Sequence, residues 1–515
     1  MNAPNQKSEE PKGKLWLLGL AAACIPLMAP PLGSGDYFWH LITGQLILEQ
    51  GALPSTDIYQ ALSPARDWIT FQWLYEVLLA LLEPFFELRG IRWFHALIAA
   101  AGIWAWSLNL GRAIKARPST MLLIAGILLF LYSDRIRIRP HVFNLLIIGA
   151  LIPALMKPQE IRGALHKTLT ISMIALLANI HAGGGLIALC LLLASTAGFV
   201  FSSGLSFEER RNALLFWLAT AGVTLLMPGF LQGAIQALVM ESSTRILFHE
   251  WQPPLIYLTL PAPDTLTLVH HYTLGLAPYL CTLTLALALI RRIFQTSLYE
   301  ILNDKRLPAI ALGFAAAILC MRSARFVYYT TLMLPALQAM GLQFPRISSI
   351  RPATKRVVPA AFGCLLLLAT YQYRMSSLGG GSDAYSKWFK WELMPGVFPE
   401  GAAQYMAENE LEGGVYNISA HHGSYLIGKL YPRIRVHYDG RGNLSPSEAN
   451  AIAFLTYERW KPHALSQVLK VYNDSGLKYI LTPPPAFPKG SEPPGYRLLY
   501  RDRVAELWQR EATGE

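Results

Sequence analysis

The residues most suited to chemistry follow directly after the first apolar run of the chain. Asp36 and His40 stand four positions apart, with Tyr37, Phe38 and Trp39 between them. If this segment is helical, the carboxylate and the imidazole share one face. Asp36 can then accept a proton from an acceptor hydroxyl or orient that hydroxyl, which makes it our candidate catalytic residue, with His40 as a substrate-binding candidate. The structural alternative is that Asp36 caps a helix and the aromatic residues form a belt at the membrane interface.

Arginines near the ends of other apolar runs could hold a phosphate group. Arg137 and Arg139 belong to a basic cluster that precedes Pro140, whereas Arg322 and Arg325 stand three apart where two apolar runs meet. Arg322 and Arg325 would share one helical face and could bind a phosphate through paired hydrogen bonds; Arg137 and Arg139 suggest a phosphate site because their cluster is expected on the side that basic residues avoid. Each pair is equally consistent with arginines that anchor the chain among lipid headgroups.

Three further segments contain substrate-binding candidates. His181 lies in a glycine-rich turn between two apolar runs, and Glu250 precedes Trp251, as in a sugar-stacking platform with a polar partner. Asp439 and Arg441 follow a predicted strand, at the end of an α/β sheet where ligands collect. Each segment also has a structural interpretation: a turn histidine, a helix end on the membrane surface, and an ion pair that holds a tight turn.

The elements that must position these residues are mostly apolar. The chain has 515 residues, of which 53% are hydrophobic and 15% charged, whereas soluble domains contain about 25% charged residues. The charge is also uneven, because the stretch from Leu15 to Tyr371 is largely apolar and the stretch from Asp383 to Glu515 has an ordinary soluble mixture. The formal charge of +11 comes from short Lys and Arg clusters between apolar runs. This pattern indicates a membrane protein and argues against a nucleic-acid partner.

A bilayer core requires about 20 apolar residues per helix. The candidate spans are 15–33, 71–88, 92–111, 119–133, 141–156, 168–184, 185–203, 212–228, 272–292, 308–322, 325–343 and 357–372. Lysines before the first span and the later basic clusters place the N-terminus in the cytoplasm and the C-terminal region outside, which requires an odd number of crossings. We expect the acidic run 71–88 to lie at the outer interface instead of crossing, which leaves about eleven crossings. The basic cluster at 134–141 then faces outward, unless the parity is wrong and the cluster is an ordinary cytoplasmic anchor.

The fold class that follows is a polytopic α-helical membrane protein with a small C-terminal α/β domain outside the cytoplasm. We expect a transmembrane domain over 1–372 with a first outer loop at 34–70, a linker at 373–393, and a soluble α/β domain over 394–515. Short strands are predicted near 415–418, 435–438 and 478–481, with helices between them and a final hairpin.

This layout resembles the GT-C class of membrane glycosyltransferases, and more narrowly a set of bacterial multi-span proteins with an extracytoplasmic C-terminal domain. The matching motifs are Asp36/Trp39/His40/Leu41, Pro54/Asp57, Trp73/Leu74/Glu76, Arg139-Pro140, 179–184 and Asp439-Gly440-Arg441. The resemblance implies an acidic residue of the first outer loop at the active site, and only Asp36 matches by position. It also implies a polyprenol-phosphate-linked sugar donor and a single displacement with inversion.

The resemblance gives no support for a metal. GT-C enzymes that use a divalent metal carry paired acids such as Asp-x-Asp in the first outer loop, and this chain has no such pair there. All five cysteines lie in apolar runs, where they indicate neither a zinc site nor a disulfide framework. We therefore expect no metal and no other cofactor.

The expected location is the bacterial inner membrane, and the expected partners are membrane lipids, a lipid-linked sugar donor and proteins of cell-envelope assembly. The alternative function is that of a non-catalytic membrane component of a polysaccharide or protein export system, whose soluble domain docks a partner. A transporter would require polar groups at midspan and internal repeats, and neither stands out.

Overall fold

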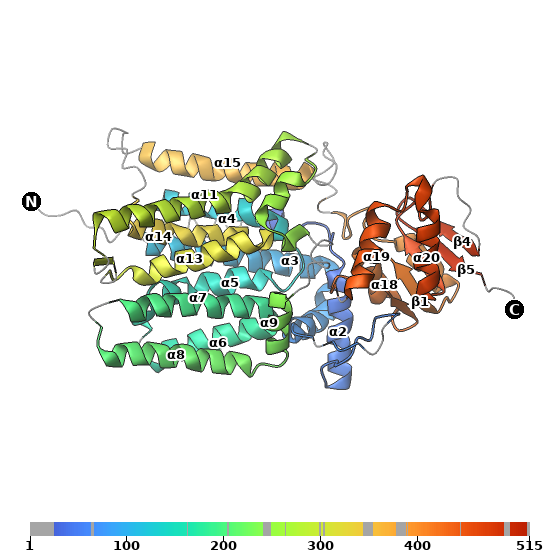
Figure 1. Cartoon of the computed structure of the whole chain (residues 1–515), viewed down its shortest axis with the longest axis horizontal. Coiled ribbons are helices and arrows are strands. Elements are labelled where there is room, and N and C mark those ends of the chain that lie inside the picture. The colour runs from blue at the N-terminus through green and yellow to red at the C-terminus, as the bar shows by residue number, and fades with distance from the viewer. Residues whose placement is uncertain are drawn as a thin grey trace, which may run out of the picture. The chain divides into compact units, whose positions relative to one another are not determined.

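The computed structural model describes residues 25–62, 66–68, 70–161, 163–202, 205–239, 249–262, 264–297, 300–301, 304–342, 354–376, 388, 390–442, 444–488 and 495–511. They divide into two compact units (Figure 1). The helical unit comprises the described residues within 1–30, 93–234 and 249–388, and the sheet unit those within 31–92, 235–248 and 389–515. Residues 377–387 and 389 of the predicted linker lie outside the described residues.

The helical unit is built from apolar helices joined by short turns. Its α-helices are α3 (Trp73–Ala113, from residue 93 onward), α4 (Pro118–Tyr132), α5 (Val142–Met156), α6 (Ala164–Ile180), α7 (Ala182–Phe201), α8 (Phe207–Leu225), α9 (Phe230–Val239, in part), α11 (Thr265–Gln295), α13 (Leu307–Arg322), α14 (Met333–Ala339) and α15 (Thr354–Ser376). The 3-10 helices are η2 (Ile25–Met28), η3 (Ser133–Arg135), η4 (Pro158–Glu160), η5 (His249–Trp251), η6 (Pro254–Thr259) and η7 (Ala324–Leu332). Neighbouring helices pack in the pairs α6 with α7, α7 with α13, and α4 with α15.

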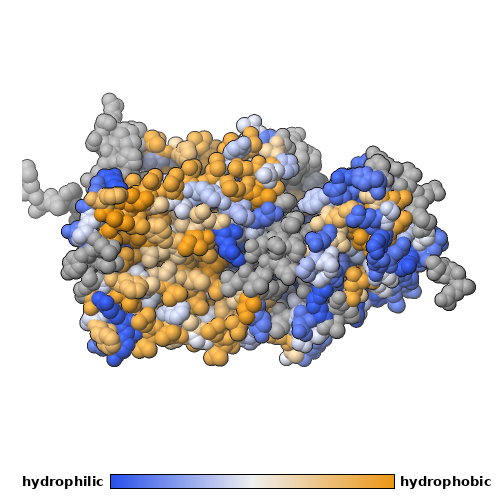
Figure 2. All heavy atoms as spheres, in the orientation of Figure 1, coloured by the Kyte–Doolittle hydropathy of each residue, from blue (hydrophilic) through white to orange (hydrophobic). Residues whose placement is uncertain are grey.

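The surface of the helical unit suits a lipid environment. Large apolar side chains are exposed along α11 and α15, among them Leu280, Leu287, Phe362 and Leu368, and the hydrophobic surface over these helices is extensive (Figure 2). Within the described residues, three helices (α3, α7 and α11) are long and apolar enough to cross a bilayer, and several shorter helices are also apolar. The predicted count of about eleven crossings is not confirmed and stays a prediction.

The sheet unit contains a mixed five-stranded sheet, as expected for the predicted small α/β domain. Its elements are α2 (Asp36–Gln50), the first part of α3, α17 (Glu400–Glu408), β1 (Gly413–Asn417), α18 (Ala420–Leu430), β2 (Ile434–Val436), α19 (Pro446–Tyr457), η8 (Pro462–Ala464), α20 (Leu465–Ser475), β3 (Tyr479–Thr482), β4 (Tyr496–Arg501) and β5 (Glu506–Arg510). The strand order is β2-β1-β3-β5-β4. β1 runs parallel to β2 and β3, and β5 runs antiparallel to β3 and β4.

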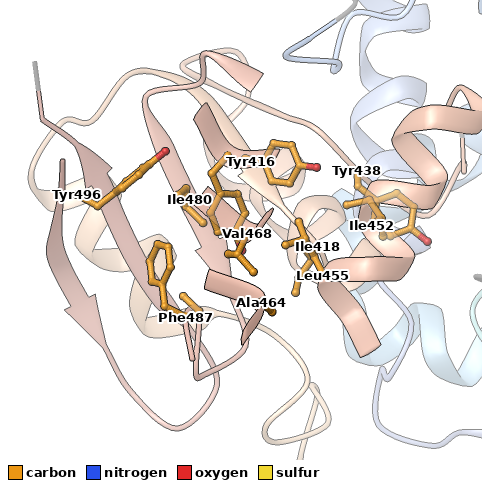
Figure 3. Packing of buried hydrophobic residues seen from close by; sticks show 12 residues of the cluster. Tyr416, Ile418, Tyr438, Ile452, Leu455, Ala464, Val468, Ile480, Phe487 and Tyr496 are labelled. Atoms are coloured by element: carbon orange, nitrogen blue, oxygen red, sulfur yellow. The ribbon is translucent and has the colours of Figure 1, made fainter. Parts of the chain in front are cut away.

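The core of the sheet unit lies between the sheet and the helices α19 and α20. Ile452 and Leu455 from α19 and Val468 from α20 are fully buried and pack against Tyr416 and Ile480 of the strands (Figure 3). A capping box helps to start α19, because Ser445 accepts a hydrogen bond from the Glu448 N–H and the Glu448 carboxylate accepts one from the Ser445 N–H.

The first loop packs on this sheet domain. The Val436 N–H of β2 donates to the Tyr59 carbonyl, and the Ala61 N–H donates to the Val436 carbonyl. Helix α2 packs on α18, where the Phe38 ring lies 4.9 Å from the Tyr425 ring, centroid to centroid. The predicted first outer loop, 34–70, thus belongs to the sheet unit, where it pairs with the edge strand β2.

Candidate functional site

Asp36 begins helix α2 in the sheet unit. The residue before it, Gly35, occupies the N-cap position and donates its N–H to Nδ1 of His421, at 3.1 Å. The Asp36 side chain is buried, and its carboxylate lies in the first turn, where the helix dipole favours negative charge. Asp36 and His40 lie on one helix, which is the condition under which their four-residue spacing places them on one face.

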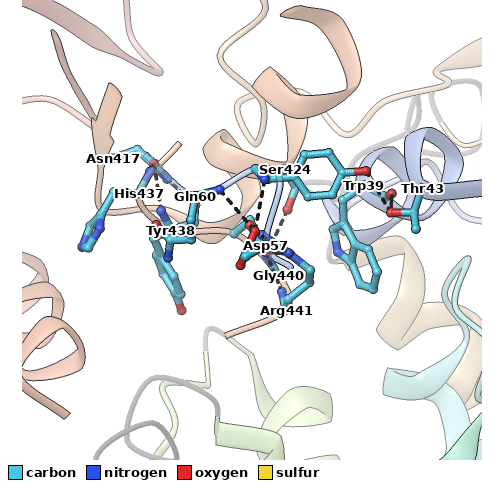
Figure 4. Close-up of polar contacts among 12 residues, drawn as sticks. Trp39, Thr43, Asp57, Gln60, Asn417, Ser424, His437, Tyr438, Gly440 and Arg441 are labelled. Atoms are coloured by element: carbon cyan, nitrogen blue, oxygen red, sulfur yellow. Dashed lines mark hydrogen bonds and ion pairs between the residues drawn. The ribbon is translucent and has the colours of Figure 1, made fainter. Parts of the chain in front are cut away.

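The carboxylate of Asp36 lies directly against Gly440. A Cβ atom placed on Gly440 would stand 2.1 Å from Asp36 Oδ1 and 3.2 Å from Trp39 Nε1, so only glycine fits at this position without movement. The turn around Gly440 is held in place from the sheet side (Figure 4). The Gly440 N–H donates to Ser424 Oγ at 3.0 Å, and Asn417 Nδ2 donates to the Tyr438 carbonyl at 2.6 Å.

Arg441 forms a buried ion triad with two carboxylates, Asp57 and Asp439. Its Nη1 lies 2.9 Å from Asp57 Oδ1, while its Nε and Nη2 lie 2.9 Å and 2.5 Å from the Asp439 oxygens. The guanidinium also lies over the rings of Tyr59 and Trp68. Burial alone would lower the pKa of Arg441, but Asp439 and Asp57 raise it above its ordinary value, so Arg441 is permanently charged.

The geometry of this triad matches the structural interpretation of Asp439 and Arg441, an ion pair that holds a tight turn. Their predicted contact with substrate stays a prediction. The sequence did not indicate Asp57 as the third member, since a Pro-x-x-Asp segment is ordinary turn chemistry.

His40 belongs to a second buried network. Its Nδ1 lies 3.1 Å from Glu76 Oε1, and Thr70 donates its hydroxyl hydrogen to the other Glu76 oxygen. The imidazole packs against the Trp39 ring, with centroids 3.6 Å apart, and edge-on against Tyr75. His40 therefore ties α2 to α3. The sequence placed Glu76 in a charged interfacial run and did not identify it as the partner of His40.

The helical unit holds a separate arginine cluster around Glu250. The Glu250 carboxylate is paired with Arg135, with Arg139 at 3.3 Å and with Arg325 at 3.5 Å. These four side chains are 7% to 20% exposed. Burial raises the pKa of Glu250, but the surrounding arginines more than offset this and hold the pKa well below its usual range. One carboxylate thus faces three guanidinium groups, which leaves an excess of positive charge.

The backbone anchors Glu250 in this position. Ser323 Oγ donates to the Glu250 carbonyl at 2.6 Å, and the Ala324 N–H donates to the Gln252 carbonyl at 2.7 Å. The Arg325 guanidinium covers the Trp251 ring, 3.7 Å from its centroid. η5 is therefore fixed to the start of η7.

The structure brings together only some of the predicted phosphate-binding residues. Arg139 and Arg325 meet at Glu250, and the charge of the exposed Arg137 also lowers the pKa of Glu250, whereas Arg322 is exposed. Arg135 completes the cluster. It belongs to the same basic run of the sequence but was not among the predicted residues.

His181 has a local role at the start of α7. Its Nδ1 accepts a hydrogen bond from the Gly184 N–H at 3.0 Å, as a helix cap does, and lies 3.0 Å from Asn144 Oδ1. Its predicted contact with substrate stays a prediction. Within the described part of the chain, no group of three His, Cys, Asp or Glu residues has the geometry to hold a metal ion.

The comparisons with known proteins show a likeness of fold. No family model matches this chain, and no curated protein matches its sequence. The fold is similar to the crystal structure of the oligosaccharyltransferase of Archaeoglobus fulgidus in its apo form, with a TM-score of 0.50 and 13% sequence identity. The match covers 92% of this chain and 70% of the archaeal chain. At this identity the likeness concerns the fold alone.

Proposed function

We propose that this protein is an inverting membrane glycosyltransferase of GT-C type. It moves a sugar from a polyprenol-phosphate-linked donor to an extracytoplasmic acceptor, which is a glycan, a lipid or a protein. The observation that carries the proposal is the arginine cluster around Glu250, in which three guanidinium groups surround one carboxylate. It lies in a chain with an apolar surface and a fold similar to that of an oligosaccharyltransferase.

The arginine cluster is assigned to the donor phosphate. Arg135, Arg139 and Arg325 together carry more positive charge than Glu250 neutralises. Guanidinium groups present N–H donors in a fork that matches phosphate oxygens. The cluster is partly exposed, so a lipid phosphate can reach the donors that Glu250 does not use. A donor carried on a lipid needs no nucleotide-binding fold.

Asp36 is assigned to the acceptor. In the proposed reaction an acceptor hydroxyl gives its proton to the Asp36 carboxylate while its oxygen forms a bond to the anomeric carbon of the sugar. The bond from that carbon to the phosphate oxygen breaks, and the polyprenyl phosphate leaves with the electron pair. A direct displacement of this kind inverts the anomeric configuration and requires no metal.

The proposed reaction also implies a location and partners for the protein. The N-terminus faces the cytoplasm of a bacterial inner membrane, and the domain at 394–515 faces outward together with Asp36. Partner proteins are those that build or export the glycosylated product.

The test is a strain that lacks this gene, complemented with wild type, Asp36→Asn or Arg325→Ala at matched membrane expression. Polyprenol-linked sugars and surface glycans are compared by mass spectrometry. We expect both variants to accumulate a lipid-linked sugar and to lack that sugar on one glycan. The control is Arg291→Ala, because Arg291 is an exposed arginine at the end of α11.

The alternative, a non-catalytic component of an export or assembly system, predicts a different result. Lipid-linked pools would then be the same in every strain, and Asp36→Asn would complement as well as wild type. That outcome would overturn the glycosyltransferase proposal.

A further inference from the structure

We propose that the turn Asp439-Gly440-Arg441 is a positioning element for Asp36, and that the ion triad with Asp57 fixes the location of this turn. The inference rests on the proposed function, in which Asp36 reacts with the acceptor. It assigns to the C-terminal domain a direct part in catalysis that goes beyond docking a partner.

The turn contacts the candidate base directly. Asp36 Oδ1 lies so close to Gly440 that a single methyl group on Gly440 would stand 2.1 Å away. The same methyl group would stand 3.2 Å from Trp39 Nε1, a buried N–H without a hydrogen-bond partner among the described residues. The backbone of the turn therefore covers the carboxylate and the indole N–H together. A backbone wall has no side-chain rotamers, so it restricts the carboxylate more tightly than a side chain would.

Hydrogen bonds and an ion pair hold the turn in place. Ser424 accepts the Gly440 N–H, and Asn417 Oδ1 accepts the N–H groups of His437 and Tyr438 at 3.1 Å and 3.2 Å. On its other side, Arg441 reaches Asp57, which precedes the strand-like segment that pairs with β2. All of these contacts converge on five consecutive residues, 437–441, of which only Gly440 has no side chain.

Position 441 requires an arginine. Its Nε and Nη2 engage Asp439 while its Nη1 engages Asp57. A lysine could supply the charge but not this planar fork. A shift of the Arg441 backbone is transmitted to the adjacent Gly440, and a displacement of about 1 Å in a reacting group can reduce a rate by roughly 10²-fold.

The test uses the full-length protein in lipid nanodiscs with a panel of synthetic polyprenyl-phosphate-linked hexoses and pentoses. Transfer to a crude membrane glycan extract gives the KM for the donor and, after normalisation to the amount of folded protein, kcat. We expect Gly440→Ala to lower kcat by roughly 10²-fold and to leave the donor KM within about twofold of wild type. The matched control is Gly401→Ala, whose Cβ would stand 2.0 Å from the Tyr500 hydroxyl oxygen in the same domain. It should retain the wild-type kcat.

A second variant protects the test if Gly440→Ala does not fold. Asp57→Asn keeps the shape of the side chain and removes one charge of the triad, so we expect a loss of kcat of about tenfold, again without a change in donor KM. We also expect the kcat of Arg441→Lys to lie between that of wild type and that of Arg441→Ala. A merely structural role would reduce the amount of folded protein but leave kcat per folded molecule and the acidic limb of the pH–rate profile unchanged.

The possible outcomes separate the two proposals. Wild-type kcat in Gly440→Ala and Asp57→Asn, with Asp36→Asn inactive, would overturn the positioning role and leave the glycosyltransferase intact. A wild-type protein that transfers no sugar from any donor, with Asp36→Asn indistinguishable from it, would overturn the proposed function and the positioning role with it.

Discussion

The carboxylate of Asp57 lies 2.9 Å from the guanidinium of Arg441, although the two residues are 384 positions apart in the chain. The ion pair joins the first loop to the C-terminal sheet domain inside one compact unit. Both side chains are almost completely buried, and a buried charge is tolerated only when it is paired. The loop that carries Asp36 is thus bound to the domain by electrostatics as well as by packing.

Removal of Arg441 should therefore destabilise the sheet unit strongly. Arg441→Ala leaves the buried carboxylates of Asp57 and Asp439 without their counter-ion, and we expect a loss of about 3–5 kcal/mol in the free energy of unfolding. Pulse proteolysis of the full-length protein across a urea series measures this change. Arg435→Ala is the control, since Arg435 is an exposed arginine on β2. A loss of less than about 1 kcal/mol, the usual value for a surface pair, would contradict the assignment.

Neutralisation of Glu250 should strengthen anion binding at the arginine cluster. Glu250→Gln keeps the side-chain shape and removes the negative charge that faces Arg135, Arg139 and Arg325. Two charges about 4 Å apart interact by about 4 kcal/mol near a protein surface, and partial exposure reduces this. We expect sulfate to bind about tenfold more tightly, measured by calorimetry on the full-length protein.

Two controls accompany this experiment, a second charge-neutralising variant and a change of pH. Glu160→Gln, at an exposed ion pair with Lys157, should leave sulfate affinity unchanged. Because the pKa of Glu250 is held well below its usual range, the carboxylate stays ionised and the wild-type affinity should be the same at mildly acidic and neutral pH. Weaker sulfate binding in Glu250→Gln would show that the carboxylate supports the anion site instead of competing for it.

The sheet unit should lose stability as the pH falls. Burial lowers the pKa of His437 from 6.5 to about 4, and neither ring nitrogen has a hydrogen-bond partner among the described residues. Between these two values the unfolded chain binds a proton that the folded chain does not, so stability rises with pH across this window and falls on acidification. The change is at most about 3 kcal/mol.

A substitution of His437 tests this expectation. His437→Phe retains the stacking on Tyr416, whose ring centroid is 4.4 Å away, and removes both unpaired nitrogens. We expect a free energy of unfolding that is equal or greater at neutral pH and that falls less steeply between about pH 6.5 and pH 4. Proteolysis of the full-length protein measures both. His463→Gln, at an exposed position, should leave the slope as in wild type. An unchanged slope in His437→Phe would assign the acid sensitivity to other groups.

The close approach of α2 and α3 requires glycine at position 44. A Cβ atom on Gly44 would stand 2.0 Å from the Glu76 carbonyl oxygen, which belongs to the backbone and cannot rotate away. We expect Gly44→Ala to destabilise the sheet unit by about 1–3 kcal/mol, the usual cost of overpacking, and to disturb the His40–Glu76 contact. Thermal unfolding in nanodiscs measures the loss. Gly222→Ala on α8 meets open space and should be tolerated, which makes it the matched control.

Local sequence patterns predicted the local structure well. Alternating apolar residues indicated the short strands of the C-terminal sheet, whereas the helix that carries Asp36 and His40 was only assumed. Apolar composition indicated a lipid-facing surface. These features depend on neighbours in the chain, so periodicity is sufficient to detect them.

Pairing between distant residues could not be predicted in the same way. Nothing in the sequence links Asp57 to Arg441, or His40 to Glu76, because each pair is selected by the tertiary packing of separate elements. The acidic run that contains Glu76 indicated a membrane interface, whereas a buried histidine and Thr70 satisfy that carboxylate. The meeting of Arg139, Arg325 and Glu250 was consistent with their types but not derivable from their spacing.

The contact between Asp36 and Gly440 has a consequence for biosynthesis. The ribosome makes the first loop long before the turn that covers its carboxylate, and at about 5–20 residues per second the intervening stretch takes roughly 20–80 s to translate. A nascent chain that has not reached residue 441 already contains Asp36 and the apolar helices, but not the surface against which Asp36 lies. The surroundings of Asp36 are thus completed only when translation is nearly finished, so a prematurely terminated chain would carry Asp36 without the turn that covers it.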